Sequence, residues 1–350
     1  MIKILVEASH PYNVLIGCDA LQEIGTHITV AKKNCTVAII SDTNVWPLYG
    51  DTVTQSLVNS GFRVVSLVIP AGEQSKSAET YFQLLNSLAE NRITRTDLIL
   101  ALGGGVVGDI AGFTAATYLR GLDYIQVPTS LLAMVDSSVG GKTAIDLPAG
   151  KNLVGAFKQP LLVLCDISVL HTLPDRVFLD GCAEVIKYGI LYDEELFAHL
   201  LENGKSFDRE YVISRCVQLK ADVVNADEFD VGSRQKLNLG HTIGHGVEVG
   251  SHYEISHGNA VSIGIAIVSK AAFSQGICSD KTYAKIINVL EQFSLPVTTN
   301  IRSECLFEAA LSDKKRSGDS INLIVPRAIG QCDITPVSID ILESFIKAGL

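Results

Sequence analysis

The sequence lacks any long apolar stretch of the kind that crosses a lipid bilayer. No run approaches the about 20 consecutive apolar residues that a membrane-spanning helix requires. The first ten residues, MIKILVEASH, also lack the apolar core and small-residue cleavage site of a secretory signal peptide. These absences predict a cytoplasmic protein without a membrane partner.

Paired cysteines and an excess of basic residues are missing as well. The eight cysteines lie scattered and include no C-x-x-C pair, which argues against a disulfide framework and against a zinc finger. Lys and Arg number 28 against 38 Asp and Glu, so the formal net charge is −10. A nucleic-acid binder needs a basic face that neutralises phosphates, so this balance argues against a nucleic-acid partner. An anionic metabolite can still bind where a few cations converge.

The pattern of apolar residues differs between the two halves of the chain. At 350 residues the chain exceeds what one hydrophobic core usually serves, which favours two domains. In the first half, short apolar runs alternate with helical patterns, which is typical of a Rossmann-like parallel sheet with helices on both faces. We predict strands at 35–41, 63–69, 98–102, 124–127 and 161–165, and helices at 46–59 and 78–90.

Strand signals thin out after residue 165, and amphipathic helical patterns dominate the second half. We predict helices at 191–202, 211–224, 260–273 and 282–293. The boundary is expected near residue 160, with an α/β N-terminal domain at 1–160 and a mainly α-helical C-terminal domain at 161–350. A crevice between two domains is a common place for a ligand site.

A glycine cluster follows the predicted strand at 98–102 and opens a helical segment. Its sequence, GGGVVGD from Gly103, lets the backbone approach a pyrophosphate, and the helix N-terminus offers unpaired N–H groups to the anion. The loop from Pro70 to Lys76 also leaves a strand, enters a helix and carries a lysine suited to a phosphate. Two such loops at one sheet edge indicate a dinucleotide, although either could be only a tight turn. Asp42 and Asn44, after an earlier strand, are candidates for a ribose hydroxyl.

Histidines and a carboxylate in the second half have the spacing of a metal site. His241 and His245 lie at i and i+4, on one face of a predicted helix, and His257 follows shortly after. Glu184 and Lys187 lie at i and i+3 on an earlier helix. A carboxylate with two imidazoles leaves an open position on a catalytic zinc. Either His241 and His245 both bind the metal, or one of them orients a ligand or transfers protons.

Several basic residues lie in low-charge, motif-like surroundings, among them Arg120, Lys142 and Lys151. Scattered lysines are normally solvated surface residues. Arginine suits bidentate contact with phosphate or carboxylate, and lysine suits a point anion. Together with a dinucleotide and a metal, these cations suggest a hydroxylated substrate that carries several negative charges.

Ten segments, in order, carry a resemblance that spans nearly the whole chain. They are PAGEQSKS, GGGVVGD, YLRG, QVPTSLLAMVDSSVGGKTAID, GKNLVGAFKQP, TLPDR, AEVIKYG, LNLGHTIGHGVE, HGNAV and DKK. With these segments the chain resembles the 3-dehydroquinate synthase family of sugar phosphate cyclases. Two positions depart from the family pattern. Asp146-Leu147-Pro148 stands where Asn-His-Pro is frequent, and Ser130 stands in place of a second threonine.

The resemblance implies a role for each group of residues. The implied metal ligands, for zinc or cobalt, are Glu184, His241 and His257, which leaves His245 for proton relay. The implied substrate contacts and catalytic residues are Arg120, Lys142, Asn152, Lys187, Lys220, Arg234, Asn238, His245 and one or both of Lys314 and Lys315. With the residues identified above, the predicted NAD contacts are Asp42, Asn44, Ala71, Gly72, Glu73, Gln74, Ser75, Lys76, Gly103, Gly104, Gly105, Val106, Val107, Gly108, Asp109, Thr129, Ser130, Asp136, Lys142, Lys151, Val169, Leu170, His171 and Thr172.

The resemblance also implies a reaction and an assembly. The implied reaction converts 3-deoxy-D-arabino-heptulosonate 7-phosphate to 3-dehydroquinate and phosphate, a step of the shikimate pathway. It proceeds by transient oxidation with NAD, phosphate elimination, re-reduction and intramolecular aldol closure. The family is typically homodimeric, and Arg120 is expected to reach the partner's phosphate site. Alternative interpretations are a cyclase that makes 2-deoxy-scyllo-inosose or a valiolone, a metal-dependent alcohol or glycerol dehydrogenase, and a non-catalytic ligand-binding relative.

Overall fold

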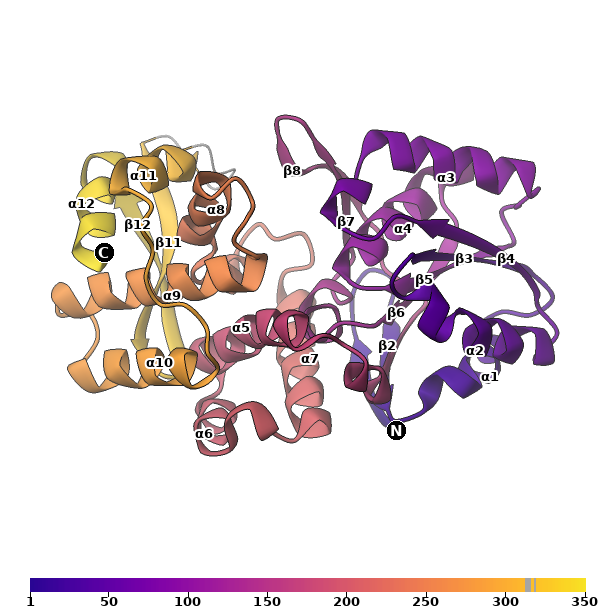
Figure 1. The fold of residues 1–350 in the computed structure, drawn as a ribbon, viewed down its shortest axis with the longest axis horizontal. Helices are drawn as coiled ribbons and strands as arrows, with labels where there is room; N and C mark the ends of the chain where they lie inside the picture. The colour runs from indigo at the N-terminus through magenta and orange to yellow at the C-terminus, as the bar shows by residue number, and fades with distance from the viewer. Residues whose placement is uncertain (312–315, 318) are drawn as a thin grey trace. The chain divides into compact units, whose positions relative to one another are not determined.

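The computed structural model describes residues 1–311, 316–317 and 319–350. The chain forms two compact units (Figure 1). Unit 1 comprises Met1–Leu173 and Arg209–Phe229, and unit 2 comprises Pro174–Asp208 and Asp230–Leu350. The predicted domain limits, 1–160 and 161–350, stay a prediction, because a compact unit is not by itself a segment shown to fold alone.

Unit 1 is built on a seven-stranded sheet with the order β1-β2-β9-β6-β5-β3-β4. All neighbouring strands are parallel except the first pair, in which β1 runs antiparallel to β2. The predicted α/β class is therefore confirmed for this half of the chain. The elements of unit 1 are β1 (Ile2–Val6), β2 (Tyr12–Gly17), α1 (Ile24–Ala31), β3 (Thr36–Asp42), α2 (Trp46–Asn59), β4 (Arg63–Ile69), α3 (Ala78–Glu90), β5 (Leu98–Gly103), α4 (Gly105–Thr117), β6 (Asp123–Pro128), β7 (Lys142–Leu147), β8 (Gly150–Phe157), β9 (Leu162–Asp166) and α7 (Arg209–Ala226).

The central strands of this sheet are buried on both faces. Every residue of β5 is buried, as the fully apolar run LILALG predicts for a strand covered by helices on both sides. In Figure 1, α3 and α4 lie on one side of the sheet, and α1 and α2 lie on the other. The amphipathic pattern of α3 turns Leu84 and Leu88 into a core with Ile99 and Ile110. This layering leaves the carboxyl ends of the parallel strands at one edge.

Unit 2 is mainly helical, as predicted, but it also contains a small antiparallel sheet with the order β10-β11-β12, which the sequence analysis missed. The predicted helix at 191–202 begins instead at Glu194, because Asp193 caps it by accepting a hydrogen bond from the Leu196 N–H at 2.9 Å. The elements of unit 2 are α5 (Asp175–Tyr192), α6 (Glu194–Asn203), α8 (His241–Gly250), α9 (His257–Ser274), α10 (Asp280–Gln292), α11 (Ser303–Leu311), β10 (Arg316–Ser317), β11 (Ser320–Ala328), β12 (Gln331–Ser338) and α12 (Ile339–Gly349).

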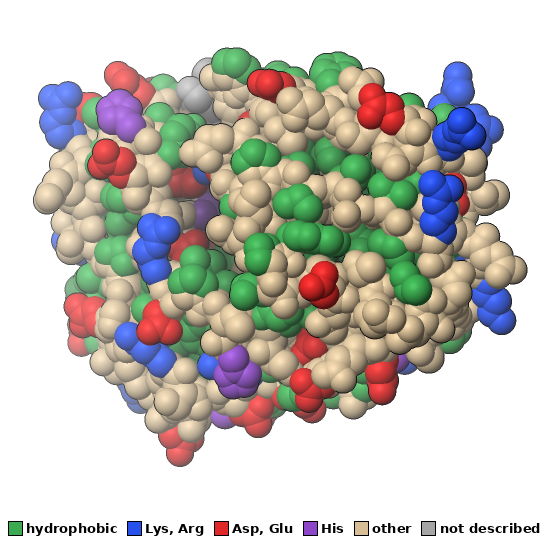
Figure 2. Space-filling model, turned by 45° about the vertical axis from the view of Figure 1, so that its right-hand side comes forward, with side chains coloured by type: hydrophobic (Ala, Val, Ile, Leu, Met, Phe, Trp, Pro, Cys, Tyr) green, Lys and Arg blue, Asp and Glu red, His purple; other side chains and the backbone are tan. Residues whose placement is uncertain are grey.

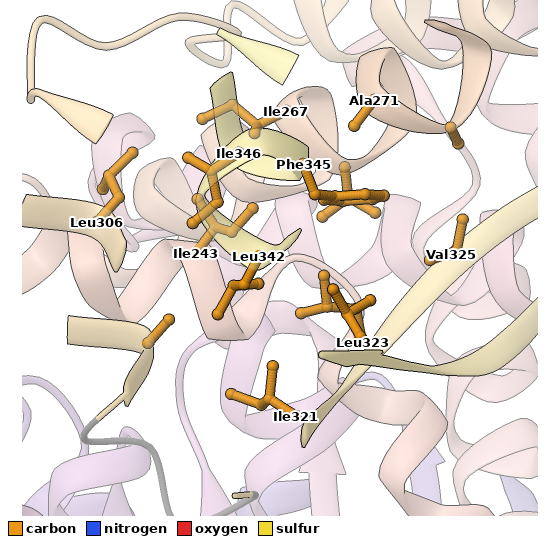
Figure 3. Close-up of a cluster of buried hydrophobic side chains, with 14 of the residues drawn as sticks. Ile243, Ile267, Ala271, Leu306, Ile321, Leu323, Val325, Leu342, Phe345 and Ile346 are labelled. Carbon is orange, nitrogen blue, oxygen red and sulfur yellow. The ribbon is translucent and has the colours of Figure 1, made fainter. Parts of the chain in front are cut away.

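One apolar cluster joins the helices and the sheet of unit 2 (Figure 3). Ile243 of α8, Ile267 of α9 and Leu306 of α11 meet Ile346 of α12 and Leu323 of β11, and all five are almost fully buried. Burying an aliphatic side chain of this size contributes about 1.5–3 kcal/mol relative to leaving it exposed. The cluster therefore holds α8 and α9 in a fixed mutual position, which matters because each of them begins with a candidate metal ligand.

Two further features of the described residues are the apolar character of the helices and the distribution of charged side chains on the surface. Among the described helices, none combines the length and the apolar character needed to cross a membrane. On the face that Figure 2 shows, Lys and Arg side chains stand singly or in small groups among uncharged and acidic ones.

Candidate active site

Three residues of unit 2 converge in the way that a metal site requires. Glu184 lies in the middle of α5, and His241 and His257 are the first residues of α8 and α9. One ligand atom from each residue lies within 4.8 Å of the others. The Oε1 atom of Glu184 is 3.3 Å from the Nε2 atoms of both His241 and His257. His241 and His257, which follow Glu184 in the sequence by 57 positions or more, thus meet at one of its carboxylate oxygens.

The donor set and its spacing fit a divalent ion such as zinc. In a tetrahedral zinc site with metal–ligand distances of about 2.0–2.1 Å, neighbouring ligand atoms lie about 3.3 Å apart. The Nδ1 atom of His241 lies 3.1 Å from the Leu239 carbonyl oxygen, and the Nδ1 atom of His257 lies 3.4 Å from Glu248 Oε2. When each Nδ1–H donates to its acceptor, the Nε2 lone pairs both face Glu184 Oε1. Two lone pairs beside a carboxylate oxygen call for a cation between them.

The charges in this cluster are strongly coupled. Burial raises the pKa of Glu184, but Lys187 and His241 lower it more, so the pKa of this carboxyl lies well below its ordinary value. Burial lowers the pKa of His257, but hydrogen bonds to Glu184 and Glu248 outweigh it and raise this pKa to about 10. For His241 burial prevails over Glu184, and the pKa is lowered. The carboxylates therefore demand positive charge at His257, where a divalent ion would supply it.

Close backbone approaches bring α5, α8 and α9 together at this point. A Cβ atom at Gly258 would lie only 1.9 Å from the carbonyl oxygen of Asp180 in α5. Gly240 precedes α8 with φ +77°, and a Cβ there would lie 2.7 Å from the Val261 carbonyl oxygen of α9. Asp180 Oδ1 also accepts hydrogen bonds from Ser256 Oγ at 2.5 Å and from the Asn259 N–H at 3.2 Å. Glycine is needed at both positions because no other residue allows these contacts.

Lys187 lies next to the proposed metal ligand on the same helix. Its side chain is 1% exposed, and its Nζ lies 2.5 Å from Glu184 Oε2. The ammonium group neutralises one oxygen of the carboxylate and leaves Oε1 to face the histidines. The prediction that Lys187 contacts substrate stays a prediction, and the structure adds that it orients Glu184.

His245 lies one helical turn after His241 but outside the group of ligand atoms that the structure brings together among its described residues. Its side chain is exposed, and its ring centre lies 5.7 Å from that of His241 and 6.3 Å from that of His257. Of the two interpretations left open by the spacing, the geometry favours the one in which His245 is beside the metal and not on it. An exposed imidazole there is well placed for proton transfer.

The remaining predicted residues of unit 2 are found before α8 or fall outside the structure. Arg234 and Asn238 belong to a 3₁₀ segment, Ser233–Asn238, that leads into His241. Arg234 is 2% exposed, and the Nδ2 of Asn238 donates to the Gln235 carbonyl oxygen at 3.0 Å. Lys314 and Lys315 lie outside the described residues.

In unit 1 the predicted cofactor residues follow five parallel strands at their carboxyl ends. Asp42 ends β3, the loop 71–76 follows β4, and the glycine turn 103–109 follows β5. Thr129 and Ser130 follow β6, and 169–172 follows β9. This edge is where open α/β sheets bind their ligands. One detail differs from the simplest expectation, because β3 lies between β4 and β5 and the two loops therefore do not leave adjacent strands.

The glycine turn is packed closely against the loop after β6. The Thr129 N–H donates to the Gly103 carbonyl oxygen at 3.0 Å. A Cβ at Gly104 would lie 3.4 Å from Ser130 Oγ, and one at Gly105 would lie 3.2 Å from Ser137 Oγ. Gly105 begins α4, a helix of 13 residues, so backbone N–H groups at its start face this edge. The hydroxyl of Ser130, at the position where the resemblance implies a threonine, thus borders the glycine turn.

Lys76 connects three of the predicted segments within unit 1. Its Nζ lies 2.8 Å from Asp109 Oδ2 and 2.5 Å from Asn152 Oδ1, with Glu73 at 3.6 Å and Asp146 at 3.9 Å. Burial lowers the pKa of Lys76, but Asp109 and Glu73 raise it more. The ammonium group, for which the loop sequence suggested a phosphate partner, is therefore surrounded by protein carboxylates. Its role as a cofactor contact stays a prediction.

Other predicted residues of unit 1 are placed as follows. Asp136, in a π-helical turn at Ala133–Ser137, forms an ion pair with Lys220 of α7. Lys142 starts β7 and is exposed, and Lys151 lies in β8 with its Nζ 3.9 Å from Glu73 Oε1. Arg120 is exposed in the turn after α4 and has φ +71°. Asp42 Oδ1 accepts hydrogen bonds from the N–H groups of residues 44 and 45 at 2.8 and 2.9 Å, which shapes the turn after β3.

Sequence reasoning missed the hairpin of β7 and β8 and the carboxylate of Glu248. The hairpin brings Asn152 to Lys76, and the turn residues DLPAG between two alternating segments were its available signal. Glu248 lies at the end of the quoted segment LNLGHTIGHGVE, seven residues after His241, which places it on the same face of α8.

Comparison with known proteins agrees with this arrangement. A curated 3-dehydroquinate synthase of Clostridium acetobutylicum is 46% identical over 332 residues, which cover 93% of each chain. The solved structure of ValA, a 2-epi-5-epi-valiolone synthase from Streptomyces hygroscopicus with NAD⁺ and Zn²⁺ bound, is 27% identical with a TM-score of 0.89 and covers 100% of this chain and 99% of its own. A 2-deoxy-scyllo-inosose synthase complexed with carbaglucose-6-phosphate, NAD⁺ and Co²⁺ has a TM-score of 0.90 at 24% identity, with both chains covered fully.

The fold is accordingly that of the sugar phosphate cyclases. Within this class, the profile described as 3-dehydroquinate synthase N-terminal matches residues 66–180, and the profile described as 3-dehydroquinate synthase C-terminal matches residues 181–316. The chain belongs to the 3-dehydroquinate synthase family.

Proposed function

We propose that this chain converts 3-deoxy-D-arabino-heptulosonate 7-phosphate to 3-dehydroquinate and phosphate, with NAD and a divalent metal as cofactors. The observation that carries the proposal is the convergence of Glu184, His241 and His257 in a chain of this family. The substrate is oxidised at C5, loses phosphate by β-elimination, is reduced again, and closes its ring by an aldol reaction. NAD supplies a reversible hydride acceptor and the divalent metal a Lewis acid.

The residues of unit 2 act at C5, the substrate carbon that is oxidised. Glu184, His241 and His257 hold the metal, and Lys187 keeps the Glu184 carboxylate charged and oriented. His245, exposed beside the ligand rings, relays the proton that leaves the C5 hydroxyl. Arg234, which is buried in the segment Ser233–Asn238 before α8, binds an anionic group of the substrate.

The residues of unit 1 hold NAD and the charged ends of the substrate. The glycine turn and the start of α4 receive the pyrophosphate, and the loops after β3, β4, β6 and β9 surround the rest of the dinucleotide. Lys142 and Asn152 contact the substrate. Because no net oxidation occurs, NAD must stay bound through the cycle, which favours a cofactor that is contacted by many loops.

Two further proposals concern assembly and location. The exposed Arg120, which has a left-handed backbone conformation, contacts the substrate phosphate across a homodimer. The protein acts in the cytoplasm on a small-molecule substrate. The uneven charge balance and the scattered cations of Figure 2 support a metabolite and not a nucleic acid as its ligand.

The decisive experiment measures phosphate release from the heptulosonate phosphate with NAD at catalytic concentration and added Zn²⁺ or Co²⁺. We expect several turnovers per NAD, no accumulation of NADH, and 3-dehydroquinate as the product identified by NMR. Stoichiometric NADH would instead indicate a dehydrogenase. A different carbocycle, formed from a hexose phosphate but not from the heptulosonate phosphate, would indicate one of the related cyclases.

A further inference from the structure

Glu248 is a buried carboxylate of unit 2 that has no part in the function proposed so far. It lies in α8, is 3% exposed, and is the last acidic residue before the turn that leads to α9. An ionised carboxylate in such a place is costly unless a donor or a positive charge compensates it. Its Oε2 atom lies 3.4 Å from the Nδ1 atom of His257, so the His257 ring is one hydrogen-bond donor that the structure provides for this carboxylate.

The two ring nitrogens of His257 face different carboxylates. Nε2 faces Glu184 Oε1 at 3.3 Å, and Nδ1 faces Glu248 Oε2 at 3.4 Å. Because these nitrogens point away from each other across the ring, Glu248 cannot share an ion that Nε2 binds. It can only accept the Nδ1–H proton, which keeps the Nε2 lone pair free for a metal.

The group that faces the Nδ1 atom of His241 is uncharged, unlike Glu248. The Nδ1 of His241 lies 3.1 Å from the carbonyl oxygen of Leu239, which is neutral. A carboxylate acceptor makes the opposite nitrogen of the ring a stronger donor to a metal than a carbonyl does. Of the two proposed histidine ligands, His257 is therefore the one whose Nδ1 faces a carboxylate side chain.

The backbone around Glu248 is held in place by the turn that follows it. The Glu248 carbonyl oxygen accepts hydrogen bonds from the Tyr253 N–H at 2.7 Å and from Ser251 Oγ at 3.1 Å. His252 and Tyr253 both have left-handed backbone conformations, with φ +53° and +62°. This turn joins the end of α8 to the start of α9, so it holds the backbone that carries the Glu248 side chain close to the start of α9.

We propose that Glu248 is a positioning residue that orients His257 and strengthens its hold on the divalent metal. The inference rests on the proposed metal site and assigns that site a residue beyond its ligands. Outer partners of this kind are worth about 10- to 100-fold in metal affinity. Glu248→Gln keeps the size of the side chain and removes its charge.

The test is the Zn²⁺ affinity of the intact chain, measured without substrate by competition with a chromophoric chelator. We expect Glu248→Gln to raise the Zn²⁺ dissociation constant about 10- to 100-fold and to change the visible absorption of the Co²⁺-loaded protein. Glu254→Gln removes an exposed carboxylate six residues later and is the matched control, with an expected change below about twofold. Unchanged NAD binding by the Glu248→Gln variant shows that unit 1 remains folded.

Parent-like Zn²⁺ affinity and a parent-like Co²⁺ spectrum in Glu248→Gln would overturn the inference and leave the proposed function standing. Failure of the parent chain itself to bind Zn²⁺ or Co²⁺ would instead refute the proposed metal site. Should the variant not fold, NMR of the imidazole nitrogens in the Zn²⁺-loaded parent decides the question. We expect a protonated Nδ1 and a metal-bound Nε2 at His257, and the reverse assignment would contradict the role of Glu248.

Discussion

Gly258 offers a sharp test of how the metal site is built, because its replacement by alanine leaves every proposed ligand in the sequence. The residue follows His257 at the start of α9 and touches the backbone of α5. An added Cβ would lie 1.9 Å from the Asp180 carbonyl oxygen, 2.6 Å from its carbonyl carbon and 2.9 Å from its Cα. All three atoms belong to the backbone of α5, so no side-chain rotation can relieve the overlap.

The size of the required movement follows from these distances. Ordinary contact begins near 3.4 Å, so the start of α9 must move away from α5 by about 1.5 Å. Overpacking of this kind costs about 1–3 kcal/mol of folding stability. Metal–ligand distances tolerate only about 0.2 Å, so His257 and Glu184 can no longer bind one ion in the same geometry. We expect the Gly258→Ala variant to fold and to bind Zn²⁺ at least about 100-fold more weakly than the parent.

Chelator competition gives the Zn²⁺ dissociation constant, and phosphate release gives the activity of the same samples. Gly17→Ala is the control. Gly17 lies in unit 1, and a Cβ atom there would lie 3.5 Å or more from its neighbours, which is ordinary contact. A folded Gly258→Ala protein with parent-like Zn²⁺ affinity would show that the contact between α5 and α9 does not set the ligand geometry.

Three other changes test separate parts of the proposal. Glu184→Gln should lose bound metal and phosphate release together, so full turnover by a metal-free variant would rule out the ligand assignment. Arg120→Ala should raise the KM for the phosphate-bearing substrate far more than the dissociation constant of NAD, and equal effects on both would argue against its role. Asp97→Asn should lower the free energy of unfolding by about 1–3 kcal/mol at neutral pH, because Asp97 accepts hydrogen bonds from the Thr36 N–H at 2.7 Å and from the Thr94 N–H at 2.6 Å. Burial raises the pKa of Asp97, but these hydrogen bonds lower it below 3.8. The stabilisation that ionised Asp97 gives to the folded state is therefore complete above pH 3.8 and is lost as the pH falls through the lower folded-state pKa. Denaturant titrations should show the difference in unfolding free energy between parent and variant shrinking in that pH range, and a constant difference would contradict this.

The fold could be predicted well where a segment carries its own periodic signal. The helix at 46–59 and the strand at 63–69 have the predicted bounds, because the helix buries one face, with Val53 and Leu57, and the strand is rich in β-branched residues. The strands β11 and β12 were missed, although β11 reads SINLIVPRA. Its apolar run is compatible with a buried helix as well as a strand, and only the pairing with β12 decides between them.

The sequence by itself determined the kinds of residue available for chemistry and the segments that carry them. The glycine turn, the acidic and imidazole donors and the family membership could all be read from it. The order of the strands could not, because β3 enters the sheet between β4 and β5 through contacts with distant segments.

Helical spacing alone did not decide which histidines share a carboxylate oxygen; the family resemblance implied His241 and His257, and the tertiary structure brings both to Glu184. Helical spacing pairs His241 with His245, yet the packing of α5, α8 and α9 brings His257 to Glu184 and leaves His245 exposed. It also decided that Lys76 faces carboxylates and that Glu248 lies beside the His257 ring. The physical reason is that spacing within one helix fixes only neighbours a turn apart, whereas a metal site depends on where different helices can approach, and here glycines 240 and 258 set that approach.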